Sequence, residues 1–214
     1  MPEEYWNHNV QYHALVLDAV VRGPALDLGC GEGLLVRRLA ERVDAVTGVD
    51  TSGEMIRLAR ERSAGLDNVT FVETDFLDAG GPLPEEEFGF VSAVAVIHHV
   101  DFKQALQAME RLLAPGGRLL IIGLARNRTP LDWIVSAAGV PAARLRALRN
   151  GGKTDPAGMP IKMPEMTWGD VRREARRILP GCRFRRHLLW RYSLTWEKGQ
   201  GVSRSPDRDL SDMR

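Results

Sequence analysis

The sequence predicts an α/β fold, in which helices cover both faces of a mostly parallel, doubly wound sheet. Two observations indicate it. Over residues 24–125, short runs that are almost continuously apolar alternate with longer stretches of helical periodicity. Strands that are apolar on both faces are typical of parallel sheets buried between helices. Glycine and proline also mark the borders of these runs, where helices and strands are expected to stop.

Five strands are expected in this front part of the chain. Their apolar runs span 24–29, 45–50, 68–75, 88–97 and 118–125. The stretches with helical periodicity span 33–43, 52–65 and 101–114, and Pro115-Gly116-Gly117 is expected to end the last of these helices. Strands separated by helical crossovers pair in parallel, so the alternation itself predicts the direction of the strands.

The rest of the chain is less regular. Residues 129–149 predict one or two short helices, broken at Gly139 and Pro141, because proline lacks a backbone donor. Composition and capping signals predict three further elements: a Gly- and Pro-rich loop or lid over 150–165, a helix over 166–181 and two strands over 182–198.

Length and composition fit a single domain. The 214 residues are 44% hydrophobic and 27% charged, close to the averages of folded proteins. We expect one domain over 1–198, with an N-terminal lid segment over 1–23, an insertion on the substrate side over 125–166, and a polar, disordered tail over 199–214.

Several classes of protein are excluded by the same features. No apolar run approaches the roughly 18 residues of a membrane span, and the N-terminus lacks the basic and apolar parts of a secretory signal. The two cysteines, Cys30 and Cys182, have neither CxxC nor metal-ligand spacing. We therefore expect a cytoplasmic protein with no membrane partner, no disulfide framework and no bound metal.

The net charge of +1 conceals an uneven distribution. Residues 1–117 carry 9 basic and 19 acidic side chains, whereas residues 118–191 carry 16 basic and 5 acidic ones. This asymmetry has two interpretations: attraction between the two parts of the chain, or an anionic partner for the basic part.

A glycine-rich turn, LDLGCGEG at residues 26–33, links the first predicted strand to the first predicted helix. Closely spaced glycines in such a turn let a ligand approach the backbone. A dinucleotide-binding turn with the spacing GxGxxG would need Gly or Ala at position 34, where this chain has Leu34. The next strand ends in Asp50, whose carboxylate has the chemistry to bind both hydroxyls of a ribose.

Similar signals follow the later strands. Asp75 and Phe76 follow the third strand, and His98 and His99 follow the fourth. In order and spacing, ALDLGCGEG, VTGVDTS, VETDFLD, FVSAVAVIHHV and LLAPGGRLLIIG resemble the successive motifs of class I methyltransferases that depend on S-adenosylmethionine (SAM). The resemblance covers about residues 24–124 and is nearest to small-molecule enzymes of the quinone-biosynthesis type. It implies a Rossmann-like sheet of seven strands with an antiparallel last strand, SAM as cofactor and S-adenosylhomocysteine as product.

The resemblance also implies which residues hold the methionyl part of SAM. Its ammonium group is expected near Asp27 and near the backbone carbonyl of Ala95. The turn beneath this part of the cofactor is expected from Gly29, Cys30, Gly31 and Gly33.

On the adenosine side, the resemblance gives the ribose hydroxyls to Asp50 and the adenine amino group to Asp75. Thr51 and Phe76 are expected on either side of the adenine ring.

Histidines are the candidates for catalysis. Methyl transfer requires alignment of the nucleophile and, for many acceptors, removal of a proton, which histidine accepts near neutral pH. His98 and His99 lie in the loop that borders the methyl group in this family, although the pair has a second interpretation, in which it only shapes the cofactor site. His13 and Tyr12 lie in an aromatic-rich N-terminal segment that either closes over the site or packs its aromatics on the sheet. If the segment closes, Tyr12 or His13 is expected to hydrogen-bond the methionyl carboxylate of SAM or the acceptor, so Tyr12 is a candidate cofactor ligand.

A small-molecule acceptor is the expected substrate, an anionic one if the basic part of the chain faces the cleft. Two other functions are the alternatives: methylation of RNA or nucleotides, and binding of SAM without methyl transfer. Nucleic acid is the weaker candidate, because the sequence contains no appended RNA-binding module.

Overall fold

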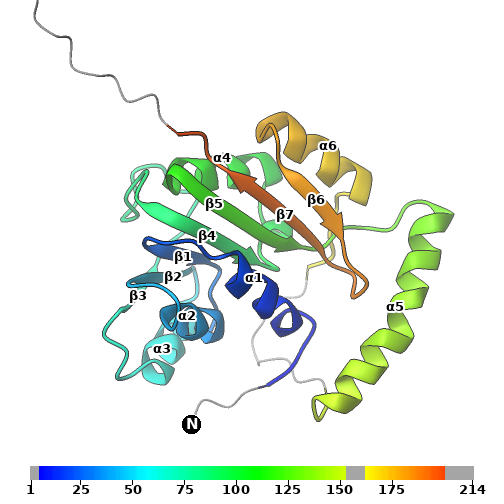
Figure 1. The fold of residues 1–214 in the computed structure, drawn as a ribbon, viewed down its shortest axis with the longest axis horizontal. Coiled ribbons are helices and arrows are strands. Elements are labelled where there is room, and N and C mark those ends of the chain that lie inside the picture. Colours follow the sequence, from blue (N-terminus) through cyan, green and yellow to red (C-terminus); the bar gives the residue numbers. More distant parts are fainter. Residues whose placement is uncertain (1–4, 153–161, 201–214) are drawn as a thin grey trace, which may run out of the picture.

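The computed structural model describes residues 5–152 and 162–200, which form one seven-stranded sheet with helices around it (Figure 1). The strands are β1 (Ala25–Leu28), β2 (Val46–Asp50), β3 (Val69–Glu73), β4 (Phe88–Val94), β5 (Leu113–Gly123), β6 (Arg183–Arg186) and β7 (Tyr192–Glu197). Their order across the sheet is β3-β2-β1-β4-β5-β7-β6. The first five strands pair in parallel and β7 runs antiparallel to β5, so the predicted fold class is confirmed.

Helices cover both faces of the sheet. They are α1 (His13–Ala19), α2 (Leu34–Ala40), α3 (Gly53–Arg62), α4 (Phe102–Leu112), α5 (Pro130–Arg149) and α6 (Trp168–Ile178), with short 3-10 helices η1 (Val10–Tyr12) and η2 (Ile97–His99). On one face, Val16 of α1, Val36 of α2 and Ile56 of α3 belong to a single buried cluster. On the other face, Leu106 of α4 and Val171 of α6 belong to a second cluster. Because both faces are covered, every residue of β1 is buried, as its apolar run predicts.

The predicted stop of α4 at Pro115-Gly116-Gly117 is wrong. These residues lie inside β5, and α4 already ends at Leu112. Phe88 pairs with Leu113 and Phe90 with Arg118, so the residues between form a bulge in β5. A bulge leaves residues out of the ladder, and proline, with no backbone N–H to donate, is tolerated there.

The predicted break at Gly139 and Pro141 is also wrong, since α5 is one helix of 20 residues. Pro141 lies on the solvent side, where water can satisfy the carbonyl that loses its donor. Gly139 lies on the inner side, where a Cβ would collide with the carbonyl oxygen of Leu188 in the β6–β7 turn. Close packing against this turn therefore holds the helix through a glycine that would weaken it in isolation.

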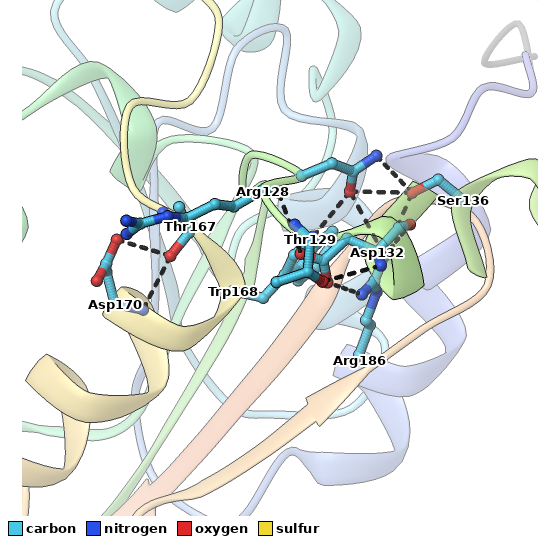
Figure 2. Close-up of polar contacts among 9 residues, drawn as sticks. Arg128, Thr129, Asp132, Ser136, Thr167, Trp168, Asp170 and Arg186 are labelled. Atoms are coloured by element: carbon cyan, nitrogen blue, oxygen red, sulfur yellow. Dashed lines mark hydrogen bonds and ion pairs between the residues drawn. The ribbon is translucent and has the colours of Figure 1, made fainter. Parts of the chain in front are cut away.

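A polar network fixes the N-terminal end of α5 to β6 and α6 (Figure 2). Arg186 of β6 donates to the carboxylate of Asp132 at 2.7 Å and to the hydroxyl of Ser136 at 3.2 Å. Its guanidinium also stacks 4.1 Å from the ring centroid of Trp168. Asp132 closes a capping box with Thr129, so the first turn of α5 is held from both sides.

The described part of the N-terminal segment contributes side chains to the core, and its role as a lid over 1–23 stays a prediction. Trp6 and Tyr12 are buried, and Val16 is completely buried between the sheet and α2. Buried aromatic and β-branched side chains of this kind stabilise the fold by packing.

Two further predictions fall partly on residues that are not described. Residues 153–161 of the predicted insertion and residues 201–214 of the predicted tail lie outside the described residues.

Candidate active site

The glycine-rich turn between β1 and α2 has a backbone that glycine adopts most readily. The φ angle is +66° at Gly29, +53° at Gly31 and +80° at Gly33. Two of these glycines are tightly packed, since a Cβ would collide with Val96 at Gly29 and would lie 2.9 Å from the ring of Phe71 at Gly33. A Cβ at Gly31, in contrast, would have no atom within 4 Å. The turn therefore presents an open backbone surface at Gly31 to a ligand.

Asp50, at the carboxyl end of β2, joins this turn to the next loop. One carboxylate oxygen accepts the backbone N–H of Gly31, and the other accepts that of Ser52, each at 2.9 Å. A carboxylate has about four lone-pair positions, so each oxygen can accept a further hydrogen bond. Thr51 is exposed beside it. Asp50 thus holds the turn and keeps acceptor capacity for the hydroxyls of a ligand.

Asp27 is buried at the end of β1, below the turn. Its Oδ1 accepts a hydrogen bond from the hydroxyl of Ser92 at 2.7 Å. Burial raises the pKa of Asp27 to about 7, the bond from Ser92 opposes this increase, and the charge of Asp50 adds to it. A cation beside this carboxyl would favour its ionised form. Burial also raises the pKa of the Cys30 thiol, which therefore stays protonated and unreactive.

β4 leads into a strained backbone at Ala95. Its φ of +59° lies in the left-handed region, which is rare for residues with a Cβ. The N–H of Ala95 donates to the carbonyl of Ile122 in β5 at 2.7 Å, which holds the residue in place. Strained residues of this kind cluster at ligand sites. The next residue, Val96, packs on Gly29, so the structure brings Ala95 and the glycine turn together.

Asp75 and Phe76 follow β3 but have different surroundings. Asp75 is exposed, and its Oδ1 accepts the N–H of Leu77 at 2.9 Å within its own loop. Phe76 is buried in the core cluster that includes Leu26 and Val49. Asp75 therefore keeps one carboxylate oxygen for a ligand, whereas the ring of Phe76 mainly supports the loop from below.

His98 and His99 lie in η2, directly after β4, with ring centroids 4.0 Å apart. The Nδ1 of His98 is buried and has no hydrogen-bond partner among the described residues. Burial first, and then the charges of His99, Arg191 and Lys162, lower the pKa of His98 to about 4. Its imidazole is therefore neutral at physiological pH, and neutral imidazole can accept a proton.

A cavity of about 180 Å³ lies beside His98. Its walls come from η2, from the start of α4, from the residue after β5 and from the segment that leads into α6. Its lining is mixed: apolar side chains such as Ile97, Phe102 and Leu124 stand beside the polar or charged ones of His98, Asp101, Lys162, Glu165 and Tyr192. A cavity with apolar walls, several polar groups and an unpaired imidazole has the character of a small-molecule site.

Tyr12 and His13 are both buried but contact different parts of the fold. The hydroxyl of Tyr12 is hydrogen-bonded to the backbone of Leu189, and its ring lies 5.2 Å from that of His187. The Nδ1 of His13 lies 3.2 Å from Nη1 of Arg38 in α2. Burial and the charge of Arg38 lower the pKa of His13 to about 3. His13 does not line the cavity beside His98, so the structure does not bring the three predicted histidines together.

Arg191 is a site residue that the sequence analysis overlooked. It lies in the turn that joins β6 to β7, its side chain is buried, and Nη2 donates to Oδ1 of Asn9 at 2.7 Å. It lies close enough to lower the pKa of His98. In the sequence it is one of several arginines in the predicted strands, and only the packing of the N-terminal segment on the β6–β7 turn distinguishes it.

Glu32 is a second overlooked residue. Although it lies within the glycine turn, its carboxylate is buried and forms ion pairs with Arg37 of α2, at 3.6 Å, and with Arg62 of α3. These pairs attach the turn to both helices. Its place inside the motif was a signal, but its partners are visible only in three dimensions.

Known proteins share both the sequence pattern and the fold. Residues 26–121 match the family described as methyltransferase domain. The chain is 35% identical over 201 residues to an uncharacterized methyltransferase of Mycobacterium tuberculosis, a match over 91% of this chain and 98% of that protein. It is also 35% identical over 129 residues to the 2-phytyl-1,4-naphtoquinone methyltransferase of Thermosynechococcus vestitus, over 56% of each.

Among solved structures, DhpI in complex with S-adenosylhomocysteine is similar, with a TM-score of 0.61 and 23% identity over 88% of this chain and 84% of DhpI. The seven-stranded sheet, the glycine turn held by Asp50 and the near full-length relative agree with one another. The chain belongs to the class I SAM-dependent methyltransferases.

Proposed function

We propose that the protein transfers the methyl group of SAM to a small-molecule acceptor bound in the cavity beside His98. The observation that carries this proposal is the buried, unpaired Nδ1 of His98 in a residue that lines the cavity. Buried polar atoms are normally paired, so one without a partner among the described residues indicates a ligand or a proton-transfer role.

The residues around the glycine turn fit the cofactor. SAM supplies a methyl group already activated on a sulfonium, so the protein mainly binds, orients and excludes water. The backbone at Gly31 is open, and Asp50 retains acceptor capacity for the ribose hydroxyls. Asp27 and the carbonyl of Ala95 would hold the ammonium group, and Asp75 the adenine amino group beside Thr51.

The acceptor we propose is a hydroxylated aromatic compound of the quinol type. Apolar walls that include Phe102 and Leu124 suit a ring, and one of the relatives is named for a naphthoquinone. Removing the proton of an acidic hydroxyl leaves negative charge on the acceptor. The nearby cations Lys162 and Arg191, both close enough to affect the pKa of His98, would stabilise that charge.

The proposal is tested with methyl-labelled SAM and three acceptors: a short-chain hydroquinone, its fully methylated analogue as control, and total RNA. Mass spectrometry of the products measures the labelled methyl group. We expect it on the hydroquinone and not on the fully methylated analogue. Label in RNA would support a nucleic-acid methyltransferase instead. If calorimetry shows SAM binding while no label leaves SAM in any reaction, the protein binds the cofactor without transferring methyl.

The affinity for SAM is expected to rise with pH because of Asp27. With a pKa of about 7 in the free protein, Asp27 is mostly protonated at pH 6 and mostly ionised at pH 8. If its carboxylate holds the ammonium group, only the ionised form binds well, and affinity should increase about tenfold between these two pH values. Calorimetry across this range measures the change.

The control is Asp27→Asn, which should lose this increase. Its comparison with the unchanged protein removes any titration of SAM itself. An equal pH dependence in both proteins would mean that Asp27 does not contact the cation.

The raised pKa of Asp27 also affects folding. The contribution of Asp27 to the stability of the folded protein is complete below the ordinary pKa of 3.8 and is lost as pH rises through about 7. Between pH 6 and pH 8, the melting temperature of the free protein should therefore fall by more than that of Asp27→Asn.

A further inference from the structure

Large apolar side chains cover the solvent side of α5. Trp133 is 64% exposed, Ile134 66% and Leu148 81%. Leu131, Val140 and Leu145 are exposed on the same helix, and together these six residues are called the outer face of α5. Single exposed apolar residues are ordinary, but a contiguous set on one helix indicates a binding surface.

Helix geometry places these side chains on one continuous surface. Each residue advances by about 100°, so Ile134, Pro141 and Leu148 lie along one line and Leu145 lies beside it. The buried residues of α5 are Ser136, Gly139 and Ala143, on the opposite side. Small residues therefore face the protein and bulky apolar residues face solvent, the reverse of an ordinary surface helix.

The exposure is built into the fold, because α5 is fixed at several points. Arg186 binds its first turn through Asp132, and Nε1 of Trp190 donates to the carbonyl of Ser136 at 2.9 Å (Figure 2 shows the Arg186 contacts). A rotation of α5 about its own axis that buried the outer face would break these hydrogen bonds. It would also place bulky side chains where Gly139 meets the carbonyl of Leu188, a contact with no room for a Cβ. In Figure 1, α5 stands at one side of the sheet, away from the other helices.

The charge around the outer face is positive. Arg144 and Arg149 are exposed on the same side of α5 as these apolar residues, and Arg128 is exposed just before the helix. Asp132 is the one acidic residue of α5, and Arg186 already binds it. The outer face is thus an apolar surface with arginines among and beside its apolar residues, and α5 has no exposed carboxylate.

We propose that the outer face of α5 docks onto an anionic phospholipid bilayer. Tryptophan, isoleucine and leucine enter the boundary between headgroups and acyl chains, and bordering arginines bind the lipid phosphates. The helix would lie in the plane of the surface. No described helix is long and apolar enough to cross a membrane, and docking in the plane of the surface does not require one. The proposal does depart from the expectation that the protein has no membrane partner.

A bilayer fits this face better than a folded partner does. A single convex helix offers no groove, and lipid conforms to a convex surface, whereas a protein partner needs a complementary hollow. If α5 of a second copy packed on this face, it would offer no free carboxylate to Arg144 and Arg149. The one carboxylate of α5, Asp132, is already paired with Arg186 in each copy. Anionic lipid supplies the missing negative charge.

Vesicle flotation with the full chain tests the proposal. One vesicle preparation contains phosphatidylcholine alone, and the other contains a minority of phosphatidylglycerol. We expect flotation with the anionic vesicles and little with the neutral ones. The double variant Trp133→Ser, Leu148→Ser and the double variant Arg144→Gln, Arg149→Gln should each bind the anionic vesicles about tenfold or more weakly.

Matched controls lie on another part of the surface. Leu66→Ser and Arg57→Gln remove an exposed leucine and an exposed arginine and should bind vesicles like the unchanged protein. All variants should keep the same SAM affinity by calorimetry, so loss of docking is separate from loss of the cofactor site. Vesicle binding that survives both double variants would place the contact elsewhere. Lack of vesicle binding, together with a dimer in analytical ultracentrifugation that the same variants dissociate, would identify the face as a protein interface and overturn the proposal.

Discussion

His98→Ala is expected to lower kcat by about 10²–10⁴-fold, the usual contribution of a general base. The imidazole is neutral, its Nδ1 has no partner among the described residues, and it lines the cavity assigned to the acceptor. SAM affinity should stay nearly constant, because no SAM contact is assigned to His98. Steady-state kinetics with the hydroquinone acceptor and calorimetry with SAM separate the two effects.

His99→Ala is the matched comparison, since it removes the neighbouring ring of the same short helix. It is expected to reduce kcat much less, because His99 does not line the cavity. The pH profile provides a readout that a structural role would not change: activity of the unchanged enzyme should fall below about pH 4–5, where His98 becomes protonated. If His99→Ala loses as much activity as His98→Ala, or if His98→Ala melts far below the unchanged protein, the assignment of the base is wrong.

Asp50→Ala is expected to weaken SAM binding about 30- to 150-fold, as for the loss of charge-assisted hydrogen bonds worth about 2–3 kcal/mol. Two effects combine, because the variant loses the ribose contacts and frees the backbone N–H groups of Gly31 and Ser52 that Asp50 now binds. Calorimetry with SAM and with S-adenosylhomocysteine measures the change.

Asp50→Asn and Asp44→Ala serve as controls for this experiment. The amide of Asn keeps one acceptor oxygen, so Asp50→Asn should bind SAM with intermediate affinity. Asp44 is an exposed carboxylate just before the same strand, and its removal should leave SAM affinity unchanged. Undiminished affinity in Asp50→Ala would overturn the ribose assignment, and an equal loss in Asp44→Ala would mean that net charge alone governs binding.

Local sequence features determined the fold class. Continuous apolar runs separated by helical periodicity predicted β1 to β5 and the helices between them, since strands buried on both faces have few polar residues. The same is true of the glycine turn. Its closely spaced glycines are evident in the sequence, and Gly29, Gly31 and Gly33 all have positive φ. Such features depend on neighbours in sequence, so sequence alone reveals them.

The errors arose where distant contacts override local preference. Gly139 and Pro141 weaken an isolated helix, but α5 continues through them because the β6–β7 turn packs against Gly139.

The chain of amino acids by itself determined the doubly wound sheet, the glycine turn and the acidic residue that follows β2. Only the tertiary structure distinguished His98 from His13, brought Arg191 to the site and left the apolar side of α5 exposed. The physical reason is that hydrogen bonding, burial and pKa depend on atoms that are far apart in sequence. Periodicity reports which face of an element is apolar, whereas only packing decides whether that face is covered.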